Sequence, residues 1–218
     1  MNLIDLALAL QLIAAALSCY LIGSIPSGYI FIKFFHKKDI TKEGSGNVGT
    51  LNAFQVSRSH FTTISVLLID LLKGALPPYL LSYLSNHDLL TIYTGCCFIV
   101  IGHNYPIWLK FKGGRGLASS AGIFAVINFA VLVTWCIVWI IVRYIKKSTL
   151  ISNYIATASL PFVVIILRSI YNDTFPILFS VYEYNYIYFI IFVCIITVLV
   201  LLKHVEVFQK SKTNNNKQ

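Results

Sequence analysis

Two short stretches of this sequence combine glycine with polar or basic side chains in a way that suits the binding of an anion. The first reads Gly44-Ser-Gly-Asn-Val-Gly49 and continues to Asn52. The second reads Phe111-Lys-Gly-Gly-Arg-Gly116 and leads into a run of small residues. Glycines allow backbone N–H groups to converge on an anion, and a following helix N-terminus adds a favourable dipole. Lys112 and Arg115 would supply charge, and an arginine can hold phosphate through two parallel hydrogen bonds.

The composition indicates that these loops are positioned by helices in a membrane. The chain has 218 residues, of which 57% are hydrophobic and 11% charged, and its mean hydropathy is +0.77. A soluble domain carries about twice that share of charge. Crossing the bilayer takes roughly 20 apolar residues in a helix, and helices are expected because backbone polar groups in lipid must be bonded within the segment. Apolar runs cover about 3–35, 60–84, 88–108, 115–146, 150–170 and 184–203.

The fourth apolar run is longer than one tilted helix needs. Asn128 lies in its middle, so we predict two short spans joined by a tight turn there, and seven transmembrane helices in all. The net charge of +9 does not indicate a nucleic-acid partner, because the basic residues are scattered over short loops between apolar runs. With seven spans, alternate connections are basic; their residues are Lys37, Lys38, Lys42 and Arg58, then Lys110, Lys112 and Arg115, then Arg143, Lys146 and Lys147, and finally Lys203, Lys210, Lys212 and Lys217.

This charge pattern predicts an all-α integral membrane protein with its N-terminus outside and its C-terminus in the cytoplasm. We expect a single domain over residues 1–209 and a polar, disordered tail over residues 210–218. Both glycine loops then lie on the cytoplasmic side and could face one site. Each loop could also be only a tight turn, with basic residues beside it that mark the cytoplasmic side of a span. We expect Lys110 to be such a residue. Two such loops on one side favour an anion site.

Other signatures of chemistry are weak or absent in the sequence. Asp70 and Lys73 lie three residues apart within the second apolar run, on one helix face, and we interpret them as a structural ion pair. The sequence has no P-loop and no serine-hydrolase elbow. No group of residues suits a metal cluster, so neither a metal nor a cofactor is expected.

The two glycine loops, together with Gly102-His-x-x-Pro106 between them, resemble a known family pattern. The chain is similar to the bacterial acyl-phosphate-dependent glycerol-3-phosphate acyltransferases, the PlsY type, over nearly its whole length. The resemblance implies transfer of a fatty acyl group from acyl phosphate to the 1-hydroxyl of glycerol 3-phosphate, which yields lysophosphatidic acid in the first step of phospholipid synthesis. It also implies a multi-pass protein of the bacterial cytoplasmic (inner) membrane, surrounded by membrane lipid, and we expect a monomer.

The resemblance also implies roles for individual residues. Ser45, Arg115 and His204 would be catalytic, with Ser45 contacting substrate, Arg115 holding phosphate and His204 closing the site from the last span. The residues expected to bind substrate are Gly44, Gly46, Asn47, Gly49, Asn52, Gln55, Arg58, Lys112, Gly113, Gly114 and Ser152.

Three positions depart from the family pattern. Gln55 stands where the family has a phosphate-binding arginine, Val207 replaces an asparagine, and Arg115 replaces a lysine. Arg58 lies one helical turn beyond Gln55 and is a candidate to supply the missing charge. An alternative function is therefore a catalytically impaired or altered-substrate paralogue that keeps the fold and binds lipid or phosphate.

Overall fold

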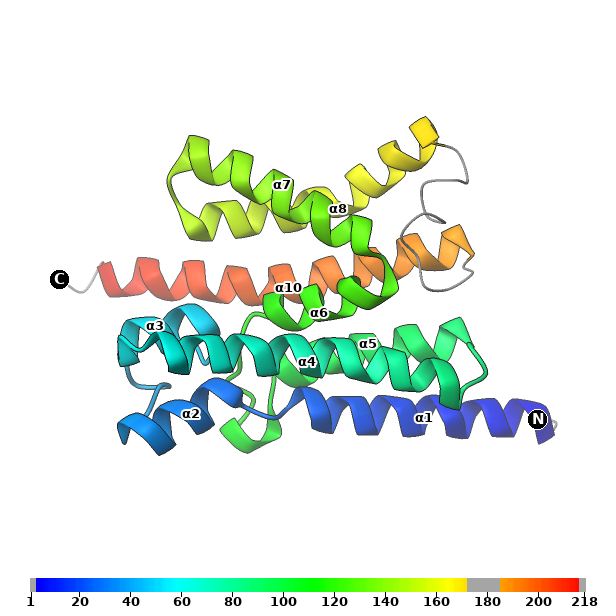
Figure 1. The fold of residues 1–218 in the computed structure, drawn as a ribbon, viewed down its shortest axis with the longest axis horizontal. Helices are drawn as coiled ribbons and strands as arrows, with labels where there is room; N and C mark the ends of the chain where they lie inside the picture. Colours follow the sequence, from blue (N-terminus) through cyan, green and yellow to red (C-terminus); the bar gives the residue numbers. More distant parts are fainter. Residues whose placement is uncertain (1–2, 172–184, 216–218) are drawn as a thin grey trace. The chain divides into compact units, whose positions relative to one another are not determined.

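A computed structural model describes residues 3–171 and 185–215, and within these ranges the elements are helices with no strand (Figure 1). The chain divides into two compact units, Met1–Val126 and Ile127–Gln218. The first unit contains α1 (Leu3–Gly23), α2 (Ser27–His36), α3 (Thr50–Ser57), α4 (His60–Leu84), α5 (Leu89–Asn104), the 3-10 helix η1 (Ile107–Leu109) and α6 (Leu117–Ile127), which ends at the boundary. The second contains α7 (Phe129–Lys146), α8 (Thr149–Tyr171) and α10 (Tyr186–Asn215). The all-α fold class is confirmed.

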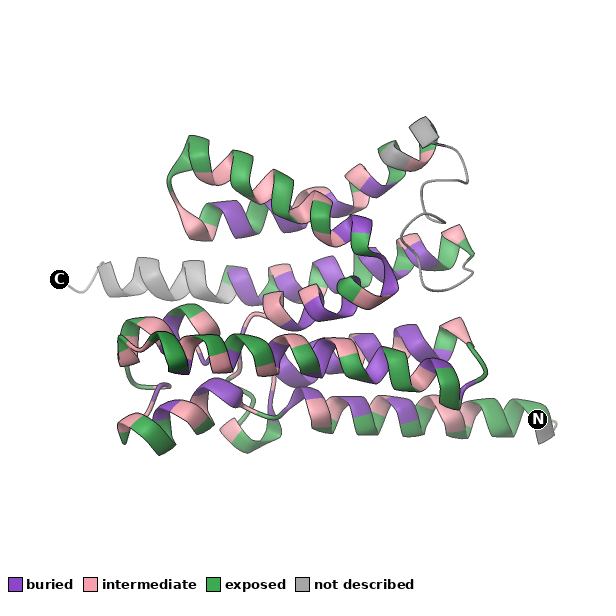
Figure 2. Cartoon of the chain, viewed as in Figure 1, coloured by how far each residue is buried: buried purple, intermediate pink, exposed green. Residues whose placement is uncertain are grey.

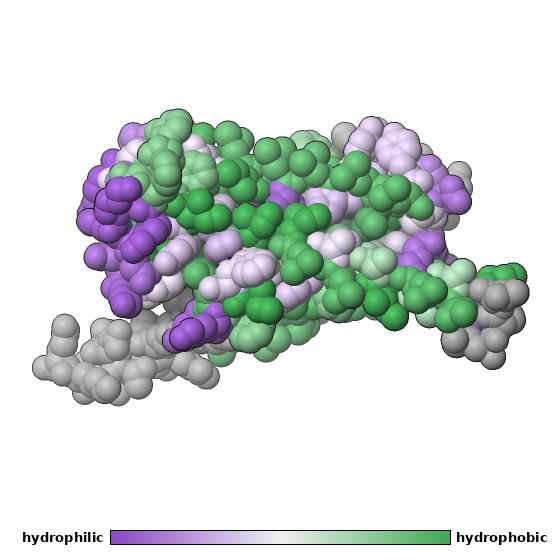
Figure 3. Space-filling view, turned by 90° about the horizontal axis from the view of Figure 1, so that it is seen from below, coloured by the Kyte–Doolittle hydropathy of each residue, from purple (hydrophilic) through white to green (hydrophobic). Residues whose placement is uncertain are grey.

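Several helices present apolar side chains to their surroundings, as lipid contact requires. Five stretches of the described residues are long and apolar enough to cross a membrane: Ile4–His36, His60–Leu84, Phe129–Lys146, Thr149–Ile166 and Tyr186–Val205. Figure 3 looks onto the side of α1 and α2 and shows mostly apolar residues, with hydrophilic residues gathered at the end where α2 finishes. The multi-pass membrane character is confirmed. The number seven stays a prediction, because α5 has 16 residues and α6 has 11.

The first apolar run, expected as one span over 3–35, is interrupted between α1 and α2. Helix α1 ends at Gly23, and Pro26 is the N-cap residue of α2. Proline has no N–H to continue a helix, and it disfavours helical backbone at the residue before it. The run therefore consists of two helices, although Ile4–His36 as a whole is one candidate span, and Pro26 is the sequence signal of the break.

Asn128 divides the fourth apolar run, as the sequence predicted. Helix α6 ends at Ile127 and α7 begins at Phe129, with Asn128 as its N-cap. The Asn128 side chain accepts a hydrogen bond from the Val131 backbone N–H at 3.4 Å. Asn128 is itself buried.

The helices of the first unit pack closely because glycines lie at their contacts. Helix α5 is the most enclosed of them and is largely buried in Figure 2. A Cβ on Gly23 of α1 would lie 2.2 Å from the Ile99 carbonyl oxygen of α5. A Cβ on Gly74 of α4 would lie 2.0 Å from the Ser119 carbonyl oxygen of α6. Small residues of this kind let transmembrane helices approach to backbone distance.

In the second unit, α7 and α8 form a hairpin, and α8 also packs against α10. The indole N–H of Trp139 on α7 donates to Asn153 Oδ1 on α8 at 2.6 Å, and that of Trp135 donates to Thr157 Oγ1 at 3.1 Å. Helix α10 continues to Asn215, into the polar tail expected at 210–218, and residues 216–218 lie outside the described residues.

Candidate active site

The most polar part of the buried interior of the first unit is a cluster around Asp70 on α4. The Asp70 side chain is 1% exposed, and its Oδ1 accepts a hydrogen bond from Ser27 Oγ of α2 at 2.6 Å. Lys73 Nζ lies 2.8 Å from the same oxygen, and His103 Nδ1 of α5 lies 3.7 Å away. The predicted structural ion pair is confirmed. Ser27 and His103 were not among the expected site residues, since nothing local connects them to Asp70.

Lys73 also stabilises the break between α1 and α2. Its Nζ donates to the Ile25 carbonyl oxygen at 3.0 Å, in the short connection that precedes Pro26. The same carbonyl oxygen also accepts from the Ser27 backbone N–H at 3.0 Å. The hydroxyl of Ser24 beside it is buried without a hydrogen-bond partner among the described residues. Lys73 therefore ties the interruption of the first span to α4.

The first glycine loop folds around the side chain of Asn52, the third residue of α3. Asn52 Oδ1 accepts from the Ser45 N–H at 2.9 Å, and Asn52 Nδ2 donates to the carbonyl oxygens of Asn47 at 2.8 Å and Glu43 at 3.1 Å. The backbone of Gly44 has φ +57°, and a Cβ there would lie 2.3 Å from Asn52 Oδ1. The Ser45 side chain remains exposed. Asn52 thus determines the shape of the loop, while Ser45 is presented on its outside.

The end of this loop leads directly into α3. Gly49 is the N-cap residue, and its N–H donates to Asn47 Oδ1 at 2.8 Å. Gln55 is exposed on α3, but α3 ends at Ser57 and Arg58 has left-handed backbone with φ 53°. The expectation that Arg58 follows Gln55 by one helical turn on a shared face is therefore wrong, because the helix ends before Arg58.

The second glycine loop returns to the C-terminal end of α5 and closes it. The N–H groups of Gly113 and Gly114 donate to the carbonyl oxygens of Asn104 and His103 at 3.1 Å and 3.0 Å. These bonds satisfy carbonyls that the end of a helix leaves unpaired. A Cβ on Gly113 would lie 2.2 Å from the His103 carbonyl oxygen, and one on Gly114 would lie 1.9 Å from the His103 ring. Side chains larger than hydrogen cannot be accommodated here.

The basic residues near the second loop differ in their surroundings. Arg115 is half-buried, and its Nε atom has no hydrogen-bond partner among the described residues. Lys110 and Lys112 are exposed. A guanidinium stays charged at neutral pH, and a buried donor without a partner is costly. Arg115 is therefore the cation of this loop that is best prepared to bind an anion.

The first glycine loop reaches a narrow recess beside the Asp70 cluster, and Gly113 and Gly114 of the second loop lie against two residues that line it. Val48 of the first loop and Pro106, which precedes the second, line this recess together with Ser24, Lys73 and His103. A Cβ on Gly28 of α2 would also lie 2.0 Å from the Val48 carbonyl oxygen, which shows how closely the first loop lies on α2. The expectation that the loops could face one site has this shared recess as its structural basis.

Two of the expected site residues belong to the second unit. Ser152 near the start of α8 is fully buried, and its hydroxyl donates to the Ser148 carbonyl oxygen at 2.8 Å. His204 on α10 is also fully buried, with Nδ1 2.9 Å from the Val200 carbonyl oxygen. The side chain of Val207 lies outside the described residues. Among the described residues, no group of His, Cys, Asp and Glu side chains could hold a metal ion.

Comparison with known proteins yields one consistent family. A family model described as glycerol-3-phosphate acyltransferase matches residues 13–213. A protein of that name from Anaplasma marginale (strain Florida) is 40% identical over 145 residues, which are 65% of this chain and 72% of the relative. Another from Pelagibacter ubique (strain HTCC1062) is 36% identical over 172 residues, which are 79% and 87% of the two chains.

Solved structures show the same fold. The glycerol 3-phosphate form of PlsY (YgiH), an integral membrane glycerol 3-phosphate acyltransferase, matches with a TM-score of 0.74 and 24% identity over 93% of this chain and 92% of the other. Its lysophosphatidic acid form matches with a TM-score of 0.72 over the same shares of both chains.

Proposed function

The chain belongs to the glycerol-3-phosphate acyltransferase family, as its glycine loops predicted, and we propose that acyl phosphate is the acyl donor of its reaction. The hydroxyl oxygen of glycerol 3-phosphate forms a bond to the acyl carbon. The bond from that carbon to the phosphate oxygen breaks, and the hydroxyl proton ends on the released phosphate. The products are lysophosphatidic acid and inorganic phosphate, and the reaction serves phospholipid synthesis.

The observation that carries this proposal is that both glycine loops lie against the same residues beside the Asp70 cluster. Val48 of the first loop lies with Lys73, His103 and Pro106, and Gly113 and Gly114 of the second loop lie against Pro106 and His103. Both substrates carry a phosphate, so a pair of adjacent anion sites suits the reaction. An acyl phosphate is already activated, and holding the two substrates in contact while neutralising their charge supplies much of the catalysis.

The first loop binds substrate through its backbone and through Ser45. Gly44, Gly46, Asn47 and Gly49 form the turn that presents the Ser45 hydroxyl. Asn52 acts indirectly, because its amide is already bonded to the backbone of the loop. Asn52 is therefore a positioning residue in this proposal.

The second loop holds a phosphate on Arg115, with Lys112, Gly113 and Gly114 around it. The two glycine N–H groups are engaged by α5, so the guanidinium provides the strongest interaction of this loop. Arginine can form two parallel bonds to phosphate where the family's lysine offers a point charge.

The remaining residues are assigned from their position in the family pattern. By that pattern alone, Ser152 is assigned to substrate binding and His204 to catalysis; both belong to the second unit. Gln55 contacts glycerol 3-phosphate with a neutral amide where the family has arginine. Arg58 stays a candidate substrate contact as an exposed cation directly after α3, although it is not on the helical face of Gln55.

We further propose that the protein crosses the cytoplasmic membrane of a bacterium seven times, with its N-terminus outside, its C-terminus inside and both glycine loops in the cytoplasm. Asn86, between α4 and α5, and Lys38, after α2, are exposed positions on opposite sides in this topology. In intact cells, a membrane-impermeant thiol reagent should label Asn86→Cys and spare Lys38→Cys. The opposite pattern would reverse the orientation.

The activity is tested by incubating the purified protein with glycerol 3-phosphate and either acyl phosphate or an acyl thioester. We expect lysophosphatidic acid and one equivalent of inorganic phosphate from acyl phosphate alone. Product from the thioester alone would refute acyl phosphate as the acyl donor. Binding of glycerol 3-phosphate without product from either donor would instead favour the non-catalytic paralogue, for which the neutral Gln55 is the motivating observation.

A further inference from the structure

The hairpin of α7 and α8 carries positive charge without any acidic residue. Residues 127–171 include no Asp and no Glu. Three of their basic residues, Arg143, Lys146 and Lys147, lie at the end of α7 and the turn after it. No salt bridge involves them among the described residues. Their counter-ion must therefore come from outside this hairpin.

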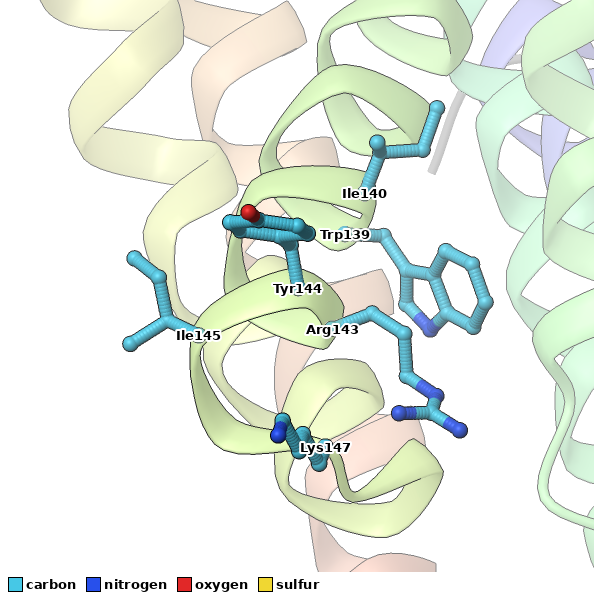
Figure 4. Close-up of a pocket in the computed structure, with 6 residues that line it drawn as sticks. All are labelled: Trp139, Ile140, Arg143, Tyr144, Ile145 and Lys147. Carbon is cyan, nitrogen blue, oxygen red and sulfur yellow. The ribbon is translucent and has the colours of Figure 1, made fainter.

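Two of these cations line an open depression on α7. It has a volume of about 740 Å³ and is lined by Trp139, Ile140, Arg143, Tyr144, Ile145 and Lys147. Figure 4 shows the Trp139 ring and the Arg143 guanidinium projecting from the same side of the helix. Lys146 is exposed but does not line the depression.

The Trp139 ring, which lines this depression, is held in place by contacts within the hairpin. The Trp139 indole N–H donates to Asn153 Oδ1 at 2.6 Å, and its ring stacks on Trp135 with 6.3 Å between the ring centres. The Tyr144 ring is 85% exposed. An indole that is already fixed in this way loses little entropy when a ligand binds against it.

The depth of the depression in the bilayer indicates the ligand. The apolar stretch that can cross the membrane ends at Lys146, so Arg143 and Tyr144 lie in its last turn. Tryptophan and tyrosine are favoured at this level, where ring and headgroup meet. Basic side chains on the cytoplasmic side of a span attract anionic lipid headgroups.

We propose that this surface binds an anionic phospholipid of the membrane. Arg143 and Lys147 contact the phosphate, Trp139 and Tyr144 lie along the glycerol region, and the side chain of Ile140, which lies deeper in the span, contacts an acyl chain. The proposal does not depend on which acyl donor the protein uses. The leaflet of the bound lipid follows from the proposed topology.

The test compares lipid retention by Arg143→Gln with that by Lys146→Gln, which removes the same charge one turn of helix away. Delipidated protein is titrated with phosphatidylglycerol or phosphatidylcholine, and bound lipid is counted by native mass spectrometry. We expect Arg143→Gln to weaken phosphatidylglycerol binding about five-fold or more. Lys146→Gln should leave phosphatidylglycerol binding unchanged. Phosphatidylcholine should bind the wild type and both variants equally. Arg143→Lys should retain most of the binding. Equal losses in the two Gln variants would show that the basic residues act only as positive charges beside a span, and this result would overturn the proposal.

A second measurement locates the lipid. Phosphatidylglycerol with brominated acyl chains should quench tryptophan fluorescence in the wild type, and Trp139→Phe should remove most of that quenching. Quenching that persists in Trp139→Phe would place the lipid elsewhere. If acyl phosphate displaces the lipid and Arg143→Gln raises only the KM for acyl phosphate, the depression is a donor entry surface and the proposal fails. None of the binding measurements requires turnover, so a failure of the proposed reaction is seen separately.

Discussion

The chain contains two Asp-x-x-Lys pairs of opposite environment, and they allow the contribution of the buried cluster to be measured. Asp70 and Lys73 have side chains 1% and 5% exposed, with 2.8 Å between Oδ1 and Nζ. Asp39 and Lys42 have side chains 31% and 82% exposed, with 4.0 Å between Oδ2 and Nζ. The Thr41 hydroxyl, which donates to Asp39 at 2.7 Å, lowers the pKa of that carboxyl.

Lys73→Met and Lys42→Met remove the same ammonium with a side chain of similar length. In the buried pair, Asp70 keeps only the Ser27 hydroxyl as a hydrogen-bond donor within the cluster. Removing one partner of a buried ion pair costs about 3–5 kcal/mol. For a protein of this length, about 2–4 °C per kcal/mol converts this to a loss of roughly 6–20 °C in Tm. Lys42→Met should cause no resolvable change, because exposed pairs contribute little.

Buried cysteines of the first unit provide the readout. Cys19 on α1 and Cys96 on α5 are both buried, and a thiol-reactive fluorophore reports their exposure as the detergent-solubilised protein is heated. Cys136 and Cys194 are exposed and are first replaced by Ala to remove the early signal.

The double variant Asp70→Asn with Lys73→Met separates charge from packing. It leaves no unpaired charge, so it should recover at least half of the Tm lost in Lys73→Met. This coupling is what a double-mutant cycle measures. If Lys73→Met melts within about 2 °C of Lys42→Met, the buried cluster does not supply the stability inferred from its geometry.

Three further changes test the site itself by steady-state acyl transfer. Arg115→Ala should lower kcat/KM by about thirty-fold to several thousand-fold, because Arg115 is half-buried in the loop. Lys110→Ala should leave most activity, because Lys110 is exposed outside the loop. Equal effects would mean that both residues act only as positive charges on the cytoplasmic side. Gly113→Ala should reduce kcat about a hundred-fold, because its Cβ would lie 2.2 Å from a backbone oxygen. Gly95→Ala should be mild, because its Cβ would meet side-chain atoms only, Leu81 Cδ1 at 2.3 Å and Cys19 Sγ at 3.0 Å. Gln55→Arg should lower the KM for glycerol 3-phosphate about ten-fold by restoring a charged hydrogen bond, and an unchanged KM would remove residue 55 from the site.

Local signals in the sequence were sufficient for the membrane class, the glycine loops and the family. Runs of apolar residues report lipid exposure directly, because in a bilayer each spanning helix must be apolar over its own length. The division at Asn128 and the Asp70–Lys73 pair were also predictable, because both depend on residues within one or two helical turns.

The roles of Asn52 and His103 became clear only in the tertiary structure. Nothing in the sequence near Asn52 tells whether its amide binds substrate or the loop, because that depends on the backbone path of residues 43–47. His103 is bracketed by Asp70 on one side and the Gly114 backbone on the other. Such contacts depend on which helices pack together, and a pattern within one segment carries no information about its neighbours.

The break within the first run and the end of α3 both concern where a helix stops. The hydropathy of the first run is continuous and it is one candidate span, yet Pro26 ends helical bonding within it, and Lys73, 48 residues away, donates to the Ile25 carbonyl. Arg58 was placed on the face of Gln55 on the assumption that α3 continues, but it ends at Ser57. Hydropathy determines where a chain can lie in the membrane. Where a helix stops depends on how the backbone groups at its end are satisfied, and at Ile25 one of the donors is a side chain of another helix.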